Sequence, residues 1–353
     1  MARVPPRRLA DAAGVVAGAA LASVLLDVAG LPSAPLFGGL LAGLVRGLAG
    51  RTRPAVPRAA TAAAQAVVGV SIGTLVDLAT LAAIGEDWLP VLLVTLATLL
   101  LTVAAGLLLR LQPGISPVTG AFAMIAGGAS GITAMARDLG ADDRMVAVLQ
   151  YLRVLLIVVL MPVVATALYG ADPGAGGTVA APDGPGPAAG AAFTAACGVA
   201  GYGLARLVRL PVPALLGPML VAAAVDLGGL SGGATVPGAV EAVAFGVIGL
   251  QVGLAFSRES LRTIGRALPL ALAIIVGLVA ACAGLGAVLA AATGVPQLDA
   301  YLATTPGGLY AVLATATGTG ADTTFVLAVQ VLRLFVMLLA APLIARRLRR
   351  RPA

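Results

Sequence analysis

Histidine and lysine are both absent from the 353 residues of this chain, so all 22 basic residues are arginine. Without imidazole, the chain cannot build a Ser–His–Asp or Cys–His arrangement or the usual copper and haem sites. The three glutamates are scattered, and the two cysteines, Cys197 and Cys282, lie in separate apolar runs, as small packing residues do. We therefore expect no enzymatic activity, no metal ligands and no cofactor.

Charged residues are also scarce, at 10% of the chain, whereas a soluble domain carries roughly 25%. Hydrophobic residues make up 60%, so the chain cannot cover a water-facing surface. The predicted fold class is an all-α polytopic membrane protein, and its first partner is the lipid bilayer. The net charge of +7 is no sign of nucleic-acid binding, because the arginines gather at loop ends and termini. We expect no direct nucleic-acid binding.

Apolar segments of the length of a membrane helix, ~20 residues, lie on both sides of a stretch rich in glycine and proline. This stretch, ADPGAGGTVAAPDGPGP, covers about residues 171–187. The predicted domains are a first membrane repeat at 1–170, a linker at 171–189, and a second membrane repeat at 190–353 that ends in an arginine-rich tail. No cleavable signal peptide is evident.

The second half of the chain repeats the first at an offset of 179–180 residues. LPSAPLFGG at 31–39 matches LPVPALLGP at 210–218, and GAD at 140–142 matches GAD at 320–322. The same offset pairs Gln150 with Gln330, Arg153 with Arg333, and Pro162 with Pro342. A composition rich in alanine and leucine would rarely align Asp, Gln, Arg and Pro by chance, so an internal duplication is predicted.

The arginine positions predict how the repeats cross the membrane, because cytoplasmic loops carry the excess of positive charge. If every apolar segment crossed, the arginines at 206, 209, 258, 262 and 266 would face outside and the arginine-free linker would face inside. If one segment in each repeat does not cross, every basic loop and both termini become cytoplasmic. We therefore predict two inverted repeats of about five transmembrane helices, each with one broken or re-entrant helix.

The segments at 118–137 and 299–317 are the best candidates for the broken helices. Each carries a helix breaker at its middle, AGGASG at 126–131 and TTPGGL at 304–309. Pro306 removes a helical hydrogen bond, and paired glycines destabilise a helix interior. Broken helices at equivalent positions of two repeats are the best indication in a sequence of a transporter binding site.

The chain resembles the bacterial membrane AbrB-like family. The resemblance is carried by AYLATTPGGL and GTGADTTFVLAVQVLRLFVMLLAAPLIAR between 300 and 346, and by GGASGITAMARDLGADDRMVAVLQYLRVL at 127–155. It covers nearly the whole chain and implies an integral protein of the bacterial inner (plasma) membrane. The family is labelled either as regulators of gene expression or as ammonia monooxygenases. The first repeat departs from the family pattern at Ala126, where proline is expected, so its break should be softer. The missing histidine argues against a copper monooxygenase.

Two arginines near the middle of membrane helices, Arg153 and Arg333, are the most informative polar residues. Burying an arginine near the bilayer centre costs ~2.5–3.5 kcal/mol on insertion scales, so each must face protein or water. Gln150 and Gln330 precede them by three positions on the same helix face. Either the arginines bind an anionic substrate beside the broken helices, or each clamps its own repeat by bonding carbonyls of the half-helix or Asp142 and Asp322.

The candidate substrate-binding residues are those of the breaks together with the Gln and Arg pairs: Gly127, Gly128, Ser130, Gln150, Arg153, Thr305, Pro306, Gly307, Gly308, Gln330 and Arg333. Asp142 and Asp322 are interpreted as helix N-caps, with ion coupling as the alternative. The predicted function is gradient-driven transport of a small anionic solute. The alternative is a membrane-embedded regulator of gene expression that acts indirectly through a partner. Homo-oligomerisation is compatible with either.

Overall fold

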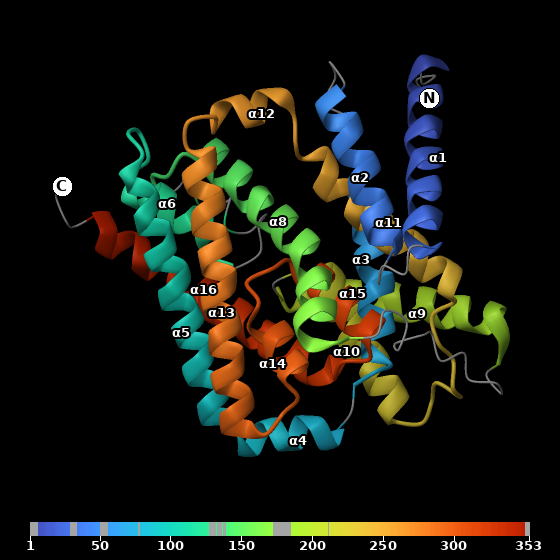
Figure 1. The fold of residues 1–353 in the computed structure, drawn as a ribbon. Coiled ribbons are helices and arrows are strands. Elements are labelled where there is room, and N and C mark those ends of the chain that lie inside the picture. Colours follow the sequence, from blue (N-terminus) through green and yellow to red (C-terminus); the bar gives the residue numbers. More distant parts are fainter. Residues whose placement is uncertain are drawn as a thin grey trace. The chain divides into compact units, whose positions relative to one another are not determined.

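The computed structural model describes residues 6–28, 34–49, 56–76, 78–126, 132, 136, 139–171, 185–210 and 212–349. Over these residues the regular structure is helical throughout, which confirms the predicted all-α fold (Figure 1). Within the described part of the chain, six helices are long and apolar enough to cross a bilayer: Asp11–Val28, Trp88–Leu111, Asp143–Tyr169, Gly186–Leu207, Leu268–Thr293 and Thr323–Leu348. Three shorter helices are also apolar: Ala34–Ala49, Pro213–Leu227 and Gly238–Leu254.

The chain forms two compact units, and each unit takes a part of both predicted repeats. The first unit contains residues 1–76 and 173–257, and the second contains 77–172 and 258–353. The helices of the first unit are α1 (Pro6–Val28), α2 (Ala34–Ala49), α3 (Arg58–Gly73), α9 (Gly186–Leu207), α10 (Pro213–Leu227) and α11 (Gly238–Leu254). Most of the predicted linker at 171–187 lies outside the described residues.

Glycine lets the helices of the first unit approach one another closely across the two repeats. α2 packs against α11, and α3 packs against α10. A Cβ added at Gly39 or Gly43 would collide with the backbone of α11, and one added at Gly69 would collide with the carbonyl of Leu215 in α10. Such contacts between small residues are how helices associate in lipid, where apolar surface alone gives no driving force.

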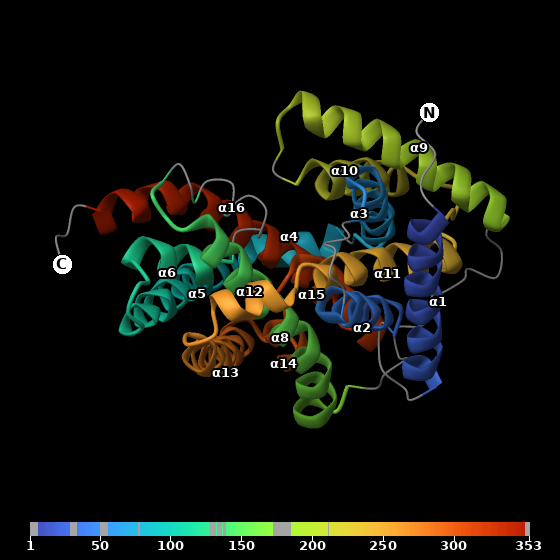
Figure 2. The ribbon, with the colours of Figure 1, turned by 90° about the horizontal axis from the view of Figure 1, so that it is seen from above.

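The second unit contains the helices that carry the predicted breaks and the polar residues near them. Its elements are α4 (Leu78–Glu86), α5 (Trp88–Leu108), η1 (Leu109–Leu111), α6 (Pro117–Met124), α8 (Asp143–Tyr169), α12 (Arg258–Thr263), α13 (Leu268–Thr293), α14 (Gln297–Thr304), α15 (Leu309–Thr319) and α16 (Thr323–Arg349). The long helices α5 and α13 lie side by side, as Figure 2 also shows.

Two short helices of the second unit pack in the same way, each on the long helix that precedes it. α6 packs on α5, where Gly106 and Gly120 face each other too closely for any side chain. α14 packs on α13, where a Cβ at Gly286 would lie 3.0 Å from the carbonyl oxygen of Ala300. Gly106 and Gly286 are related by the same offset of 180 residues, so this close contact occurs once in each repeat.

Candidate functional site at the two helix breaks

The second break lies where the sequence predicts it. α14 ends at Thr304, and Thr305 leaves the helix with an extended backbone at φ −59° and ψ 124°. Pro306 follows, the N–H of Gly307 bonds the carbonyl of Thr305 at 2.8 Å, and α15 begins at Leu309. A proline restricts the residue before it to extended conformations and cannot donate a helical hydrogen bond, so the TPGG sequence ends one helix and allows another to start.

The first break begins at the equivalent residue, although it has no proline. α6 ends at Met124, and Ile125 leaves it at φ −63° and ψ 124°, nearly the angles of Thr305. The expectation that Ala126 would soften this break is therefore wrong for the side of the break that the structure describes. The candidate residues Gly127, Gly128 and Ser130 lie outside the described residues.

Arg333 and Gln330 hold the carbonyl end of α14. Gln330 Nε2 donates to the carbonyls of Leu302 at 2.8 Å, Ala303 at 3.2 Å and Thr305 at 3.2 Å. Arg333 Nη1 donates to the carbonyl of Thr305 at 2.6 Å and lies 3.4 Å from that of Thr304, and its Nη2 donates to Gln330 Oε1. Both side chains are buried.

Arg153 and Gln150 hold the carbonyl end of α6 in the same manner. Gln150 Nε2 donates to the carbonyls of Phe122 at 2.7 Å and Ile125 at 2.8 Å. Arg153 Nη1 donates to the carbonyl of Met124, and its Nη2 donates to Gln150 Oε1 at 2.9 Å. We call each Gln–Arg pair with the carbonyls that it bonds a carbonyl clamp, one in each repeat.

The carbonyl clamps explain how two arginines can lie inside a membrane protein. The last carbonyls of a helix have no partner within it and carry about half a negative charge together. The guanidinium groups satisfy these carbonyls and are in turn stabilised by them. Of the two roles considered from the sequence, the structure shows bonding to the half-helix carbonyls. Substrate binding by the arginines stays a prediction.

The Nε atom of each arginine is not part of these hydrogen bonds. Nε of Arg153 and Nε of Arg333 are buried and lack a hydrogen-bond partner in the described part of the chain. The two side chains are only 2% and 3% exposed, so their surroundings are almost entirely protein. A buried donor without an acceptor costs roughly 1–3 kcal/mol and calls for an explanation.

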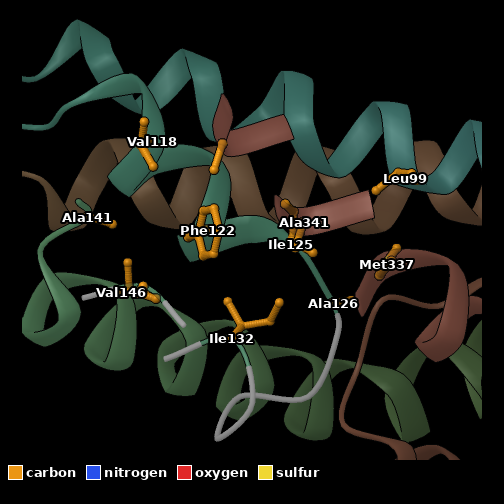
Figure 3. Close-up of a cluster of buried hydrophobic side chains, with 12 residues drawn as sticks. Leu99, Val118, Phe122, Ile125, Ala126, Ile132, Ala141, Val146, Met337 and Ala341 are labelled. Carbon is orange, nitrogen blue, oxygen red and sulfur yellow. The ribbon is translucent and has the colours of Figure 1, made fainter. Parts of the chain in front are cut away.

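The long helix that carries each clamp also packs against the other repeat's break. A Cβ added at Gly307 would lie 2.9 Å from Ile157 of α8, and one added at Gly308 would lie 3.3 Å from Val154 of α8. In turn, Met337 of α16 belongs to the buried cluster that contains Ile125 and Ala126 (Figure 3). Met337 is the counterpart of Ile157 at the offset of 180 residues. The two breaks therefore lie close together in the second unit.

Asp142 and Asp322 begin the two long helices, as their interpretation as N-caps requires. Asp142 accepts hydrogen bonds from the backbone N–H groups of Arg144 at 3.0 Å and Met145 at 3.1 Å. Asp322 accepts one from Phe325 at 3.0 Å. The backbone N–H of Asp142 bonds Thr119 Oγ1 at 3.0 Å, and that of Asp322 bonds Asp299 Oδ1 at 3.2 Å, so each cap is also tied to its half-helix.

The second break also has hydroxyl and carboxyl groups at Thr304, Thr305 and Asp299, of which only Thr305 is among the candidate substrate-binding residues. Thr304 Oγ1 donates to the carbonyl of Cys282 or Ala300, both at 2.9 Å, and Thr305 Oγ1 donates to that of Tyr301 at 2.7 Å. Tyr301 stacks on Tyr169, with ring centroids 5.2 Å apart. A comparison of α6 with α14 at the offset of 180 residues would have found Asp299, because it is a carboxylate where α6 has Thr119.

Comparisons with known proteins agree with the resemblance seen in the sequence. Residues 36–349 match the family described as "Transition state regulatory protein AbrB". The chain is 36% identical to a protein of Escherichia coli (strain K12) named "Putative regulator AbrB", over 90% of each chain. It is 26% identical to a protein of Bacillus subtilis (strain 168) named "Uncharacterized protein YhjN", over 79% of this chain and 76% of that one.

Proposed function

The chain belongs to the AbrB family of membrane proteins, and we propose that it is a secondary transporter of a small anionic solute, driven by a gradient. The observation that carries this proposal is the pair of buried carbonyl clamps beside two neighbouring helix breaks. In a protein that only had to span the membrane, continuous helices would satisfy their own carbonyls and would need no arginine. Interrupted helices with buried charge are typical of sites at which a polar solute passes.

The beginning of α15 supplies a second positive element near the clamps. The first N–H groups of a helix have no acceptor within it, and its N-terminus carries about half a positive charge. Gly308 is the N-cap of α15 and provides no side-chain acceptor for these groups. Since the carbonyl end of α14 is already bonded by Gln330 and Arg333, an anion is the solute that this arrangement favours.

We further propose that the two repeats are inverted, that both termini are cytoplasmic and that the protein resides in the bacterial inner membrane. The distribution of arginine supports this topology. Labelling a cysteine introduced at Ala175 should succeed from outside intact cells, whereas one introduced at Ala353 should need permeabilised cells. Labelling at position 175 only after permeabilisation would show that the repeats are parallel. The natural cysteines, Cys197 and Cys282, are buried and give little background.

Indirect regulation of gene expression is the second candidate function, and the printed name of the Escherichia coli relative supports it. Regulation would require a cytoplasmic partner, and the arginine-rich end of α16 is the natural contact for one. A chain truncated after Ala345 that keeps its cellular effect would exclude this form of regulation. In either role we propose no catalytic activity, no resident cofactor and no direct contact with nucleic acid.

The transport proposal is tested with purified protein in sealed proteoliposomes. A panel of small organic and inorganic anions is offered with an inward gradient of protons or sodium, and uptake is followed with labelled solutes. We expect uptake of at least one anion that stops when the gradient is dissipated. The matched control is Arg153→Gln with Arg333→Gln, which keeps two polar side chains but removes both charges. Vesicles without gradient-dependent uptake of any anion would overturn the proposal.

A further inference from the structure

We infer that the solute is a dianion held between Arg153 and Arg333, through the side of each guanidinium group that the carbonyl clamps leave unused. This inference rests on the proposed function and deepens it by naming the charge of the solute. The described part of the chain offers neither arginine a carboxylate: every hydrogen bond that the structure gives them goes to a carbonyl or to a glutamine.

The geometry of a guanidinium group shows what remains free. Its five N–H bonds lie in one plane, and Nε–H points in the same direction as one hydrogen of Nη2, forming a fork that fits two oxygen atoms. In both repeats Nη1 and Nη2 each have an acceptor, whereas Nε has none among the described residues. An oxyanion that bonded Nε would satisfy the buried donor in each repeat without displacing a carbonyl.

The packing of the two breaks places both arginines in the same buried region of the second unit. The charge of Arg333 acts on Arg153, and the thiol of Cys282 lies within electrostatic reach of both guanidinium groups. The packing agrees, because the break that Arg333 clamps contacts Val154, the residue next to Arg153. Two like charges in the same buried region repel each other, and protein around them screens the repulsion poorly.

The charge balance is compatible with one or two negative charges on the ligand, and the presence of two separate arginines favours two. Two guanidinium groups face the carbonyl ends of α6 and α14, which offset about half a charge each. About one positive charge remains, and the N-terminus of α15 adds about half of another. A monoanion would leave about half a positive charge and a dianion about half a negative charge, so the sum alone does not choose between them. A dianion reaches both arginines and also relieves their mutual repulsion.

A dicarboxylate and a divalent oxyanion share this chemistry, and matched pairs of probes distinguish them. Succinate is compared with succinamate, which has the same length but one charge fewer, and sulfate is compared with methyl sulfate. Binding to the purified protein is measured by calorimetry in detergent, without any flux assay. We expect at least about a tenfold preference for the dianion in one of the two pairs, the effect of one added charge in a poorly screened site.

Cys282 allows a sharper test that does not remove either arginine. Its side chain is fully buried and lies within electrostatic reach of both, and Asp is close to Cys in volume. Cys282→Asp would place a carboxylate next to the guanidinium groups and should reduce the preference for the dianion to about twofold or less. Cys282→Asn is the matched neutral control and should keep the preference of the natural protein.

The outcomes separate this inference from the proposed function. Equal affinities for dianion and monoanion in both pairs, or an unchanged preference in Cys282→Asp, would overturn the dianion while leaving an anion transporter in place. Binding of no anion, together with vesicles that show no uptake, would overturn both. If Cys282→Asp does not fold, the comparison of matched probes on the natural protein still decides the question.

Discussion

The two breaks begin with nearly the same backbone angles and have the same clamp, but among the described residues the second break begins with more polar side chains than the first. α6 ends on Met124 and Ile125, whereas α14 ends on Thr304 and Thr305. Arg153 contacts one carbonyl through Nη1, and Arg333 contacts two. A duplicated architecture can therefore keep its supporting bonds in both copies while the described ends of its two half-helices differ in polarity.

The largest effect should come from removing the arginines one at a time. Arg333→Ala removes three hydrogen bonds, to the carbonyls of Thr304 and Thr305 and to Gln330 Oε1, and should lower stability by ~3 kcal/mol, because a hydrogen bond to a charged group contributes ~1.5–3 kcal/mol. Arg153→Ala removes two hydrogen bonds and should cost less. Both losses are measured by thermal unfolding in detergent, and uptake should disappear in Arg333→Ala.

Replacing Arg333 by lysine tests whether transport needs only the positive charge or also the planar shape of the guanidinium group. Arg333→Lys keeps the charge but lacks the planar fork, so uptake should recover only in part. If Arg333→Ala folds and transports normally while Arg153→Ala is inactive, the second repeat does not dominate. If both variants transport normally, neither arginine binds the solute.

The next largest effect concerns the glycines of the second break. A Cβ at Gly307 would meet Ile157 at 2.9 Å and Val312 at 3.2 Å, whereas one at Gly308 would meet Val154 at 3.3 Å. Gly307→Leu should therefore reduce uptake at least about tenfold, because overpacking costs roughly 1–3 kcal/mol, and should reduce expression less. Gly308→Ala should be tolerated. An active Gly307→Leu would show that Ile157 can move and that the two breaks are not tightly packed.

Sequence alone was enough to find the breaks and the residues that clamp them. The offset paired Gln150 with Gln330 and Arg153 with Arg333, and paired glycines with a proline marked the end of α14. It could not tell which atoms the arginines bond, because a carbonyl becomes available only through the backbone angles at Ile125 and Thr305. The two positions adopt nearly the same backbone angles although one is isoleucine and the other is threonine.

The division into two units could not be predicted from the repeats either. The repeats are continuous in sequence, but α2 packs on α11 and α3 on α10, so helices from both halves join in one unit. These contacts depend on glycines such as Gly39 and Gly69, whose lack of a side chain matters only once the facing backbone is known. The many glycines were visible in the sequence, but their partners were not.

A smaller effect is expected where the two repeats differ in one carboxylate. Asp299 and Thr119 occupy equivalent positions and accept the same kind of bond, from the N–H groups of Asp322 and Asp142. Asp299→Thr should change stability by less than about 1 kcal/mol, because one acceptor replaces another, and should keep uptake. Lost uptake in a variant that folds normally would assign the carboxylate a part in transport that Thr119 does not have.

The smallest effect should follow from giving the first break the proline that it lacks. Ile125 already has the extended backbone that a following proline demands, and no backbone bond donated by Ala126 is found among the turn and loop bonds of the described residues. Ala126→Pro should therefore be accommodated and should stabilise the protein by ~0.4–1 kcal/mol through the unfolded chain. The opposite change in the second repeat, Pro306→Ala, should lower the free energy of unfolding by about the same amount. If Ala126→Pro unfolds the protein or abolishes uptake, the first break must adopt a helical conformation near this residue at some stage of transport. The two breaks would then have similar backbones in only one state of the protein.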